Sequence, residues 1–290
     1  MKQKPDRTST AGNRYLDLRK LARSTQRPTD ELLQLYALEG FLDRLNLSAH
    51  ANDFVLKGGM LLSAYNSRRP TKDIDFSVTN LNNETDDILQ IITTILTNPN
   101  DDGLEFNTKE IVVEPIRQEE IYNSLRVKLK CSLLTAKIFF HIDINTGDPI
   151  WPPATRVEVP RILGGEPIPL DGYSIEMILA EKLVTTIQRG IANTRWRDFV
   201  DINSLSKENF DTITLTKAIT KVAEHRNTTI ELLSVQLKEY PSLAQQQWQA
   251  WRRKQQLTDT TPESFKDLLE EIFRTYDPIL KPLITASSND

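Results

Sequence analysis

The sequence is poor in the residues that build disulfide frameworks and zinc clusters. Its 290 residues contain one cysteine, Cys131, so no disulfide can form within the chain and no cysteine-based zinc cluster can be assembled. The three histidines, His50, His141 and His225, are scattered and show no ligand spacing. Cys131 lies in an alternating apolar pattern, and we expect it to be a small buried side chain.

Long apolar runs and an excess of positive charge are also missing. No run approaches the roughly 20 apolar residues that cross a bilayer, and residues 1–6 lack the apolar stretch of a signal peptide. We therefore predict a cytoplasmic protein with no membrane partner. The net charge of −4 does not favour a uniformly basic nucleic-acid binder, but it permits a local basic patch.

The length and the residue patterns predict an α/β fold with two domains. A chain of 290 residues favours two lobes over a single core. A stretch rich in proline, residues 149–169, interrupts the patterned segments and is expected to be an extended hinge. We place an N-terminal lobe with a mixed sheet at residues 1–155 and a mostly helical C-terminal lobe at residues 156–290.

Apolar periodicity predicts the elements of these lobes. Helices are expected over residues 13–24, 29–46, about 82–95 and 175–189, and strands over residues 104–117, 124–134, 136–145 and 156–159. In the second of these strands Arg126, Lys128 and Lys130 alternate with apolar residues. One face of that strand is therefore expected to be buried and the other basic.

Two features close together in the sequence suit phosphate chemistry. Gly58 and Gly59 stand between apolar runs, where a tight turn can bring bare N–H groups to an anion. Asp73 and Asp75 flank Ile74, so on a strand both carboxylates face one side. Such a pair repels itself unless a shared divalent cation is bound.

The order of these residues resembles the nucleotidyltransferase superfamily, and in detail the AbiEii/MenT family of nucleotidyltransferase toxins. The motif residues are Lys57, Gly58, Gly59, Arg68 or Arg69, Thr71, Asp73 and Asp75. The resemblance implies that residues 1–155 form the nucleotidyltransferase lobe and that the site lies in a cleft to which the helical lobe contributes.

The resemblance also implies roles for these residues. Asp73 and Asp75 would bind Mg²⁺, with Asp143 as a third carboxylate because it lies between two isoleucines on a later strand. Asp75 would also orient the acceptor hydroxyl. The nucleotide phosphates would be held by Lys57, Gly58, Gly59 and Arg68 or Arg69. Many family members have Ser or Thr after the second glycine; here Met60 stands there, and Ser63 is the expected replacement hydroxyl.

A second group of candidates lies in the helical lobe. Lys182 falls at the edge of an apolar helical stripe, so its ammonium either extends to solvent or reaches into a cleft. Asp198 and Asp201 are three residues apart and share a helix face. Both segments resemble the same family, which implies that Lys182 neutralises phosphate charge and that the two aspartates position it or act on the acceptor.

The function that the resemblance implies is transfer of a nucleoside monophosphate from an NTP to RNA. The expected acceptor is the 3′ end of tRNA, where added nucleotides block aminoacylation and translation. The expected partner is a cognate antitoxin encoded by a neighbouring gene. Two alternatives remain open: a nucleotidyltransferase that modifies a small molecule such as an antibiotic, and a non-catalytic nucleotide-binding regulator.

Overall fold

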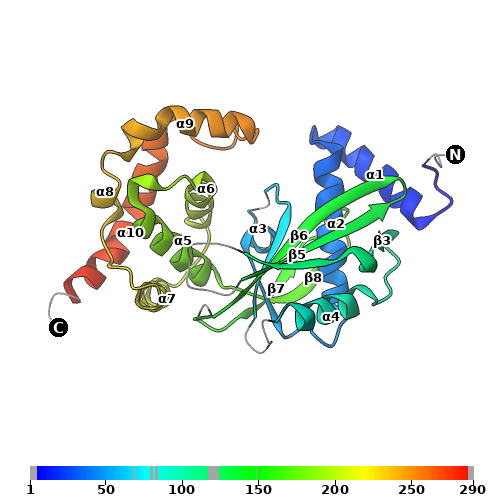
Figure 1. The fold of residues 1–290 in the computed structure, drawn as a ribbon. Helices are drawn as coiled ribbons and strands as arrows, with labels where there is room; N and C mark the ends of the chain where they lie inside the picture. The colour runs from blue at the N-terminus through cyan, green and yellow to red at the C-terminus, as the bar shows by residue number, and fades with distance from the viewer. Residues whose placement is uncertain are drawn as a thin grey trace. The chain divides into compact units, whose positions relative to one another are not determined.

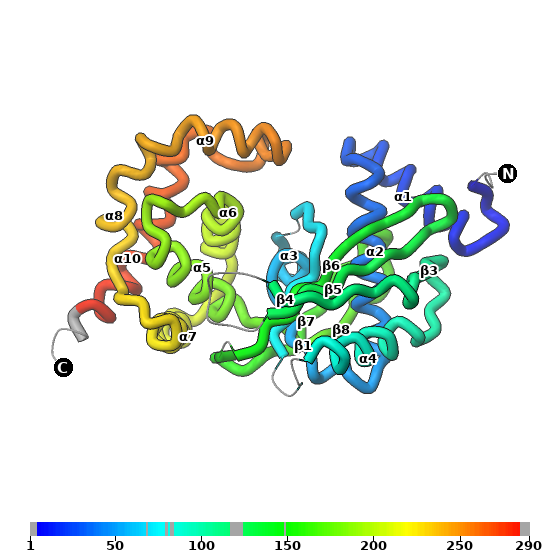
Figure 2. The backbone as a smooth tube through the Cα atoms, viewed as in Figure 1, coloured from blue at the N-terminus to red at the C-terminus, as the bar shows by residue number. Residues whose placement is uncertain are grey.

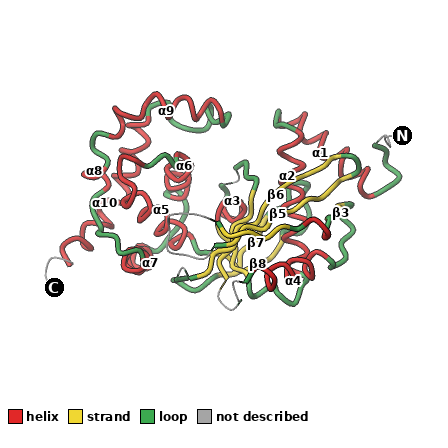
Figure 3. The backbone as a smooth tube through the Cα atoms, viewed as in Figure 1, coloured by secondary structure: helices red, strands yellow, loops and turns green. Residues whose placement is uncertain are grey.

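The computed structural model describes residues 5–67, 69–78, 81, 84–116, 124–147 and 149–286. The chain forms two compact units. The first comprises Met1–Asp148 and Ala154–Tyr173, and the second comprises Pro149–Pro153 and Ser174–Asp290. All the described strands belong to the first unit, and the described part of the second unit is helical (Figure 3).

The first unit is built on a mixed sheet with helices on it (Figure 1). Its strands are β1 (Phe54–Lys57), β2 (Asp73–Val78), β3 (Leu104–Phe106), β4 (Val112–Pro115), β5 (Leu125–Leu133), β6 (Ala136–Thr146), β7 (Thr155–Val159) and β8 (Ile168–Gly172). The order across the sheet is β3-β5-β6-β2-β1-β8-β7, and β4 also pairs with β5. Strand β2 runs antiparallel to β1 and parallel to β6.

The helices of the first unit pack against this sheet and against one another. They are α1 (Thr10–Thr25), α2 (Thr29–Asn46), the short α3 (Gly58–Leu61) and α4 (Thr85–Leu96), with short 3-10 turns at Leu62–Tyr65 and Thr108–Glu110. Helix α2 contacts α1, α4, β6 and β8 and lies against the sheet (Figure 2). Its apolar residues are buried. The predicted helix over residues 29–46 is confirmed with those bounds, and the one predicted over residues 13–24 is confirmed but begins earlier, at Thr10.

Two expectations for the first unit need correction. The strand expected over residues 104–117 is broken into β3 and β4, because the Asn107 side chain accepts a hydrogen bond from the Lys109 N–H at 3.2 Å and starts a 3-10 turn. The expected hinge contains β7 and β8, which pair with each other, while β8 also pairs with β1. The sheet therefore continues beyond residue 155, and the compact units divide at Tyr173.

The second unit is a helical body around an aromatic core. Its helices are α5 (Ile175–Arg189), α6 (Trp196–Leu205), α7 (Thr212–His225), α8 (Leu233–Gln236), α9 (Tyr240–Lys254) and α10 (Phe265–Ala286), with a 3-10 turn at Gly190–Ala192. Trp196 stacks on Tyr240 with ring centroids 5.9 Å apart. Trp248 on α9 is fully buried. In the part of the chain that the structure describes, no helix combines the length and the apolarity that a membrane span requires.

Candidate functional site

Strand β2 presents two carboxylates on one side of the sheet. Ile74 and Phe76 are fully buried, whereas Asp73 and Asp75, which alternate with them, are partly accessible to solvent. The buried pair anchors the strand, so the two carboxylates are held by the core behind them. Across the parallel neighbour β6, Asp73 lies opposite His141 and Asp75 lies opposite Asp143.

The glycine turn after β1 packs directly against this pair. Gly58 has φ of +68°, and a Cβ built there would lie 1.8 Å from Asp75 Oδ2. A Cβ on Gly59 would lie 2.7 Å from Thr71 Oγ1 and 3.1 Å from Arg69 Nη1. No side chain fits at either position without displacing a neighbour, so the double glycine allows the backbone to approach the carboxylates.

The pKa values of the two aspartates are shifted in opposite directions. Burial raises the pKa of Asp73, but hydrogen bonds from His141 and Thr71 outweigh that effect and lower it to about 2. The Thr71 hydroxyl donates to Asp73 Oδ1 at 2.6 Å, and His141 Nε2 lies 3.5 Å from Asp73 Oδ2. Burial, followed by the charge of Asp73, raises the pKa of Asp75 to about 6. Negative charge on Asp75 is therefore unfavourable unless a cation compensates it.

Lys57 is a lysine of the sheet that acts on this pair. It lies opposite Asp75 in the β1–β2 ladder, is buried, and its Nζ lies 5.7 Å from the centroid of the Tyr173 ring. Its charge lowers the pKa of Asp75, although burial dominates that group. Ser63, the expected replacement hydroxyl, is buried and donates to the Met60 carbonyl at 2.7 Å. In this arrangement its O–H is already in use.

Asp143 is held by an arginine that the sequence reasoning did not single out for this role. Arg126 on β5 lies opposite Asp143, and its Nε and Nη2 donate to the two carboxylate oxygens at 2.8 and 2.7 Å. This two-point pairing fixes Asp143 beside Asp75 and neutralises it. The role of Asp143 as a metal ligand stays a prediction, because it would share its oxygens with Arg126.

The donor set fits a divalent cation that also binds substrate. Among the described residues, no group of three or more His, Cys, Asp or Glu side chains is arranged to hold a metal ion. Mg²⁺ in phosphate-transfer sites takes one or two carboxylates and completes its shell with phosphate oxygens and water. Asp73 and Asp75 supply that number, and the raised pKa of Asp75 indicates a position where positive charge is favourable.

The second unit contains its own buried charge cluster. Lys182 Nζ on α5 donates to Asp198 Oδ1 at 2.6 Å and to Asp201 Oδ2 at 2.9 Å on α6. Both aspartate side chains are buried, and Lys182 is itself mostly buried. Burial raises the pKa of Asp198, but Lys182 and Arg195 together lower it below its ordinary value. The ammonium is therefore held by two carboxylates, which is the geometry that positioning of Lys182 by these aspartates requires.

The structure thus assembles most of the predicted residues in two groups. The first unit brings together Lys57, Gly58, Gly59, Arg69, Asp73, Asp75 and Asp143. The second holds Lys182, Asp198 and Asp201. Arg68 lies outside the described residues. Sequence reasoning missed His141 and Arg126, although strand alternation places His141 on the side of Asp143, and Arg126 belongs to the predicted basic face.

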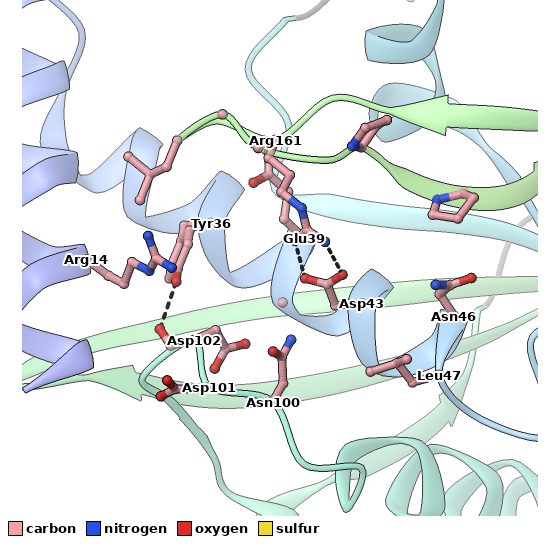
Figure 4. A pocket seen from close by; sticks show the side chains of 16 residues that line it. Arg14, Tyr36, Glu39, Asp43, Asn46, Leu47, Asn100, Asp101, Asp102 and Arg161 are labelled. Carbon is pink, nitrogen blue, oxygen red and sulfur yellow. Dashed lines mark hydrogen bonds and ion pairs between the residues drawn. The ribbon is translucent and has the colours of Figure 1, made fainter.

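A well-formed pocket in the first unit lies away from these residues. It has a volume of about 510 Å³, and none of the predicted site residues lines it. Arg161 pairs there with Asp43 through both carboxylate oxygens (Figure 4). Glu39 accepts a hydrogen bond from the Ile162 N–H at 2.9 Å. The Tyr36 hydroxyl donates to the Asp102 carbonyl at 2.7 Å. These hydrogen bonds and ion pairs join α2 to the loops around it. The polar residues of this pocket therefore have a structural role in holding those segments together.

Comparisons with known proteins give a matching family and similar solved structures. The sequence model of a family described as "Nucleotidyl transferase AbiEii toxin, Type IV TA system" matches residues 40–271. No match was found among curated proteins.

The chain is also similar to the crystal structure of JHP933 from Helicobacter pylori, with a TM-score of 0.51 and 16% identity over 89% of this chain and 95% of that one. It is similar as well to an antigenic nucleotidyltransferase-like protein from Paracoccidioides brasiliensis, with a TM-score of 0.37 and 19% identity over 68% of this chain and 89% of that one. At this level of identity, the likeness to JHP933 indicates a shared fold.

Proposed function

Since the chain belongs to the AbiEii family of nucleotidyltransferase toxins, we propose that it transfers a nucleoside monophosphate from an NTP to an RNA acceptor. The acceptor end of tRNA is the first candidate, and its modification would prevent aminoacylation. The family is that of type IV toxin–antitoxin systems, which implies an antitoxin partner. A neighbouring gene is its expected source.

One observation carries this proposal: the contact between the glycine turn and the carboxylate pair. The backbone at Gly58 approaches the Asp75 carboxylate so closely that a Cβ would lie 1.8 Å from it. A phosphate held by main-chain N–H groups of the turn would therefore lie next to Asp75. Nucleotidyl transfer needs this proximity, because the reacting phosphate must meet both its anion cradle and the group that orients the acceptor hydroxyl.

The residues of the first unit divide the work in the following way. Asp73 and Asp75 would hold Mg²⁺, which supplies positive charge to the phosphates when it is bound. Gly58 and Gly59 give access to the backbone, while Lys57 and Arg69 contribute positive charge beside them. Asp75 has the higher proton affinity of the pair. It is therefore the better group to accept a hydrogen bond from the acceptor hydroxyl.

The roles of the second unit stay predictions. Lys182 is proposed to neutralise charge on the phosphates, with Asp198 and Asp201 fixing the position of its ammonium. Ser63 contributes less in this proposal than the sequence suggested, because its hydroxyl donates to a main-chain carbonyl.

Transfer of labelled nucleotide tests the proposal directly. The protein is incubated with Mg²⁺, total tRNA and each α-³²P-labelled NTP in turn, and the RNA is resolved by electrophoresis. We expect label in RNA with wild-type protein and none with Asp75→Ala, whose folded state is checked by circular dichroism. Label only on small molecules would support the antibiotic-type alternative. A folded Asp75→Ala protein with near wild-type transfer would show that the metal assignment is wrong.

A further inference from the structure

The open face of β5 and β6 carries a groove that continues from the Asp pair. The groove has a volume of about 580 Å³ and lies over β4, β5, β6 and the turn before β4. His141 lines it and also lies 3.5 Å from Asp73 Oδ2. One side chain therefore belongs both to the groove and to the surroundings of the carboxylate pair, so the two are continuous on one sheet face.

The charged residues of this groove are mainly lysines. Lys109, Lys128 and Lys130 line it, against one glutamate, Glu110. The protein as a whole has a net charge of −4, so this concentration of lysines differs in sign from the rest of the molecule. Lys130 forms an ion pair with Glu110, and Lys128 forms one with Glu114 on β4. These pairs are exposed to solvent and can exchange for phosphate contacts at little cost.

An exposed aromatic ring lies among these lysines. Phe139 on β6 is 59% exposed, although its neighbours Ile138 and Phe140 are buried. Lys130 lies opposite it in the ladder, with Nζ 5.8 Å from the ring centroid. A large apolar ring exposed on the face of a sheet beside ammonium groups is an arrangement on which bases of single-stranded nucleic acid stack.

The position of the ring also suits an acceptor whose end reaches the Asp pair. Asp143 lies opposite Asp75, and Phe139 is four residues before it on β6. That separation is about 14 Å along the strand. At about 3.4 Å for each stacked nucleotide, it corresponds to about four nucleotides.

We propose that the β5–β6 groove, formed by Lys109, Lys128, Lys130 and Phe139, binds a single-stranded RNA segment whose end is presented to Asp73 and Asp75. The inference rests on the proposed transfer to RNA and assigns the surface that holds that acceptor. The lysines contact the phosphates, and Phe139 stacks on a base about four nucleotides from the end. An acidic protein could meet the lysines, but it would not use the exposed ring in this way.

Binding of a fluorescein-labelled, 12-nucleotide single-stranded RNA tests the inference by fluorescence anisotropy, without NTP or divalent cation. Lys128→Gln with Lys130→Gln should weaken binding about tenfold at 50 mM salt and reduce the slope of log K against log salt by about 1.4. Phe139→Thr should weaken it by about 5- to 100-fold, while Phe139→Trp should retain it. Lys266→Gln is the matched control, because Lys266 is an exposed lysine that pairs with a glutamate outside the groove.

Several outcomes would overturn the assignment. These are absence of RNA binding by the wild type, equal binding by the groove variants and Lys266→Gln, and competition by polyglutamate as effective as by unlabelled RNA at equal charge. The proposed function fails separately, when NTP label does not reach RNA. Because binding is measured without NTP, RNA bound through the groove without transfer would retain this inference and reject that function. Transfer of label to RNA that is equally fast in the wild type and the groove variants would retain the proposed function and reject the groove as the RNA-binding surface.

Discussion

Replacing Gly58 by alanine should damage catalysis far more than stability. Two effects act at this position. Alanine at φ +68° costs about 1 to 2 kcal/mol of folding free energy in the left-handed region. The added Cβ would also lie 1.8 Å from Asp75 Oδ2, so that carboxylate must move away by about 1.6 Å to reach the ordinary contact distance of 3.4 Å. A displacement of about 1 Å at a reacting centre can cost about 100-fold in rate.

Gly164 offers a matched control in the same unit. It has φ of +75°, and nothing lies within 4 Å of the Cβ that alanine would add. Gly164→Ala therefore carries the backbone strain without the contact to the carboxylate. We expect both variants to lose a few degrees in melting temperature, and only Gly58→Ala to lose nucleotide transfer by about 100-fold or more. Equal transfer rates for the two variants, measured with labelled NTP, would refute the reasoning.

Two further variants test the charged groups. Burial and the neighbouring charge raise the pKa of Asp75 from 3.8 to about 6. The ionised carboxylate therefore lowers the free energy of unfolding as the pH rises from 3.8, and the full effect is reached above about pH 6. Asp75→Asn should raise the free energy of unfolding by about 1 to 2 kcal/mol at pH 7.5 without Mg²⁺, after allowance for partial exposure. The gain, followed by thermal melting, should shrink as the pH falls towards 4; a constant gain contradicts the stated cause. Lys182→Ala leaves Asp198 and Asp201 buried without their shared cation, and should destabilise the second unit by about 3 to 5 kcal/mol. Adding Asp198→Asn and Asp201→Asn should restore much of the loss in urea denaturation, and an unchanged midpoint for the single variant would argue against a charge effect.

Much of the first unit could be predicted because its signals are local. Alternation in β2 placed Ile74 and Phe76 in the core and both carboxylates on the other side, and the structure has this arrangement. Helix α2 has the bounds that its broad apolar stripe and proline start predict. These features depend on the period of one element and need no knowledge of its neighbours.

The parts that escaped prediction depend on pairing between distant segments. Strand β8 looked like part of a proline-rich linker, because Pro167 and Pro169 weaken any strand signal. It is a strand because each of its residues pairs with β7, and Leu56 and Gly172 also meet across the β1–β8 ladder, more than 100 residues apart in sequence. The pairing of Arg126 with Asp143 likewise follows from the register of β5 and β6.

Lys182 illustrates a different limit. Its place on the border of an apolar stripe allowed either an outward or an inward course. The choice was made by α6, which supplies two buried carboxylates to receive the ammonium. Propensity within one helix contains no information of that kind, since the stabilising partners come from another helix.

Strand β8 is synthesised long after its neighbour β1, and this order has a consequence for how the protein folds during synthesis. β1 ends at Lys57, but its outer neighbour β8 is completed only at Gly172. At roughly 5 to 20 residues per second, a ribosome needs about 6 to 23 seconds to add the intervening chain. During that interval β1 has an open edge, to which other chains can add. We expect protease to cut ribosome-bound chains that end before β8 within the first unit. Chains long enough for β8 to emerge from the ribosome should resist this cleavage. Each new molecule would thus pass through a period of vulnerability to protease before its first unit is complete.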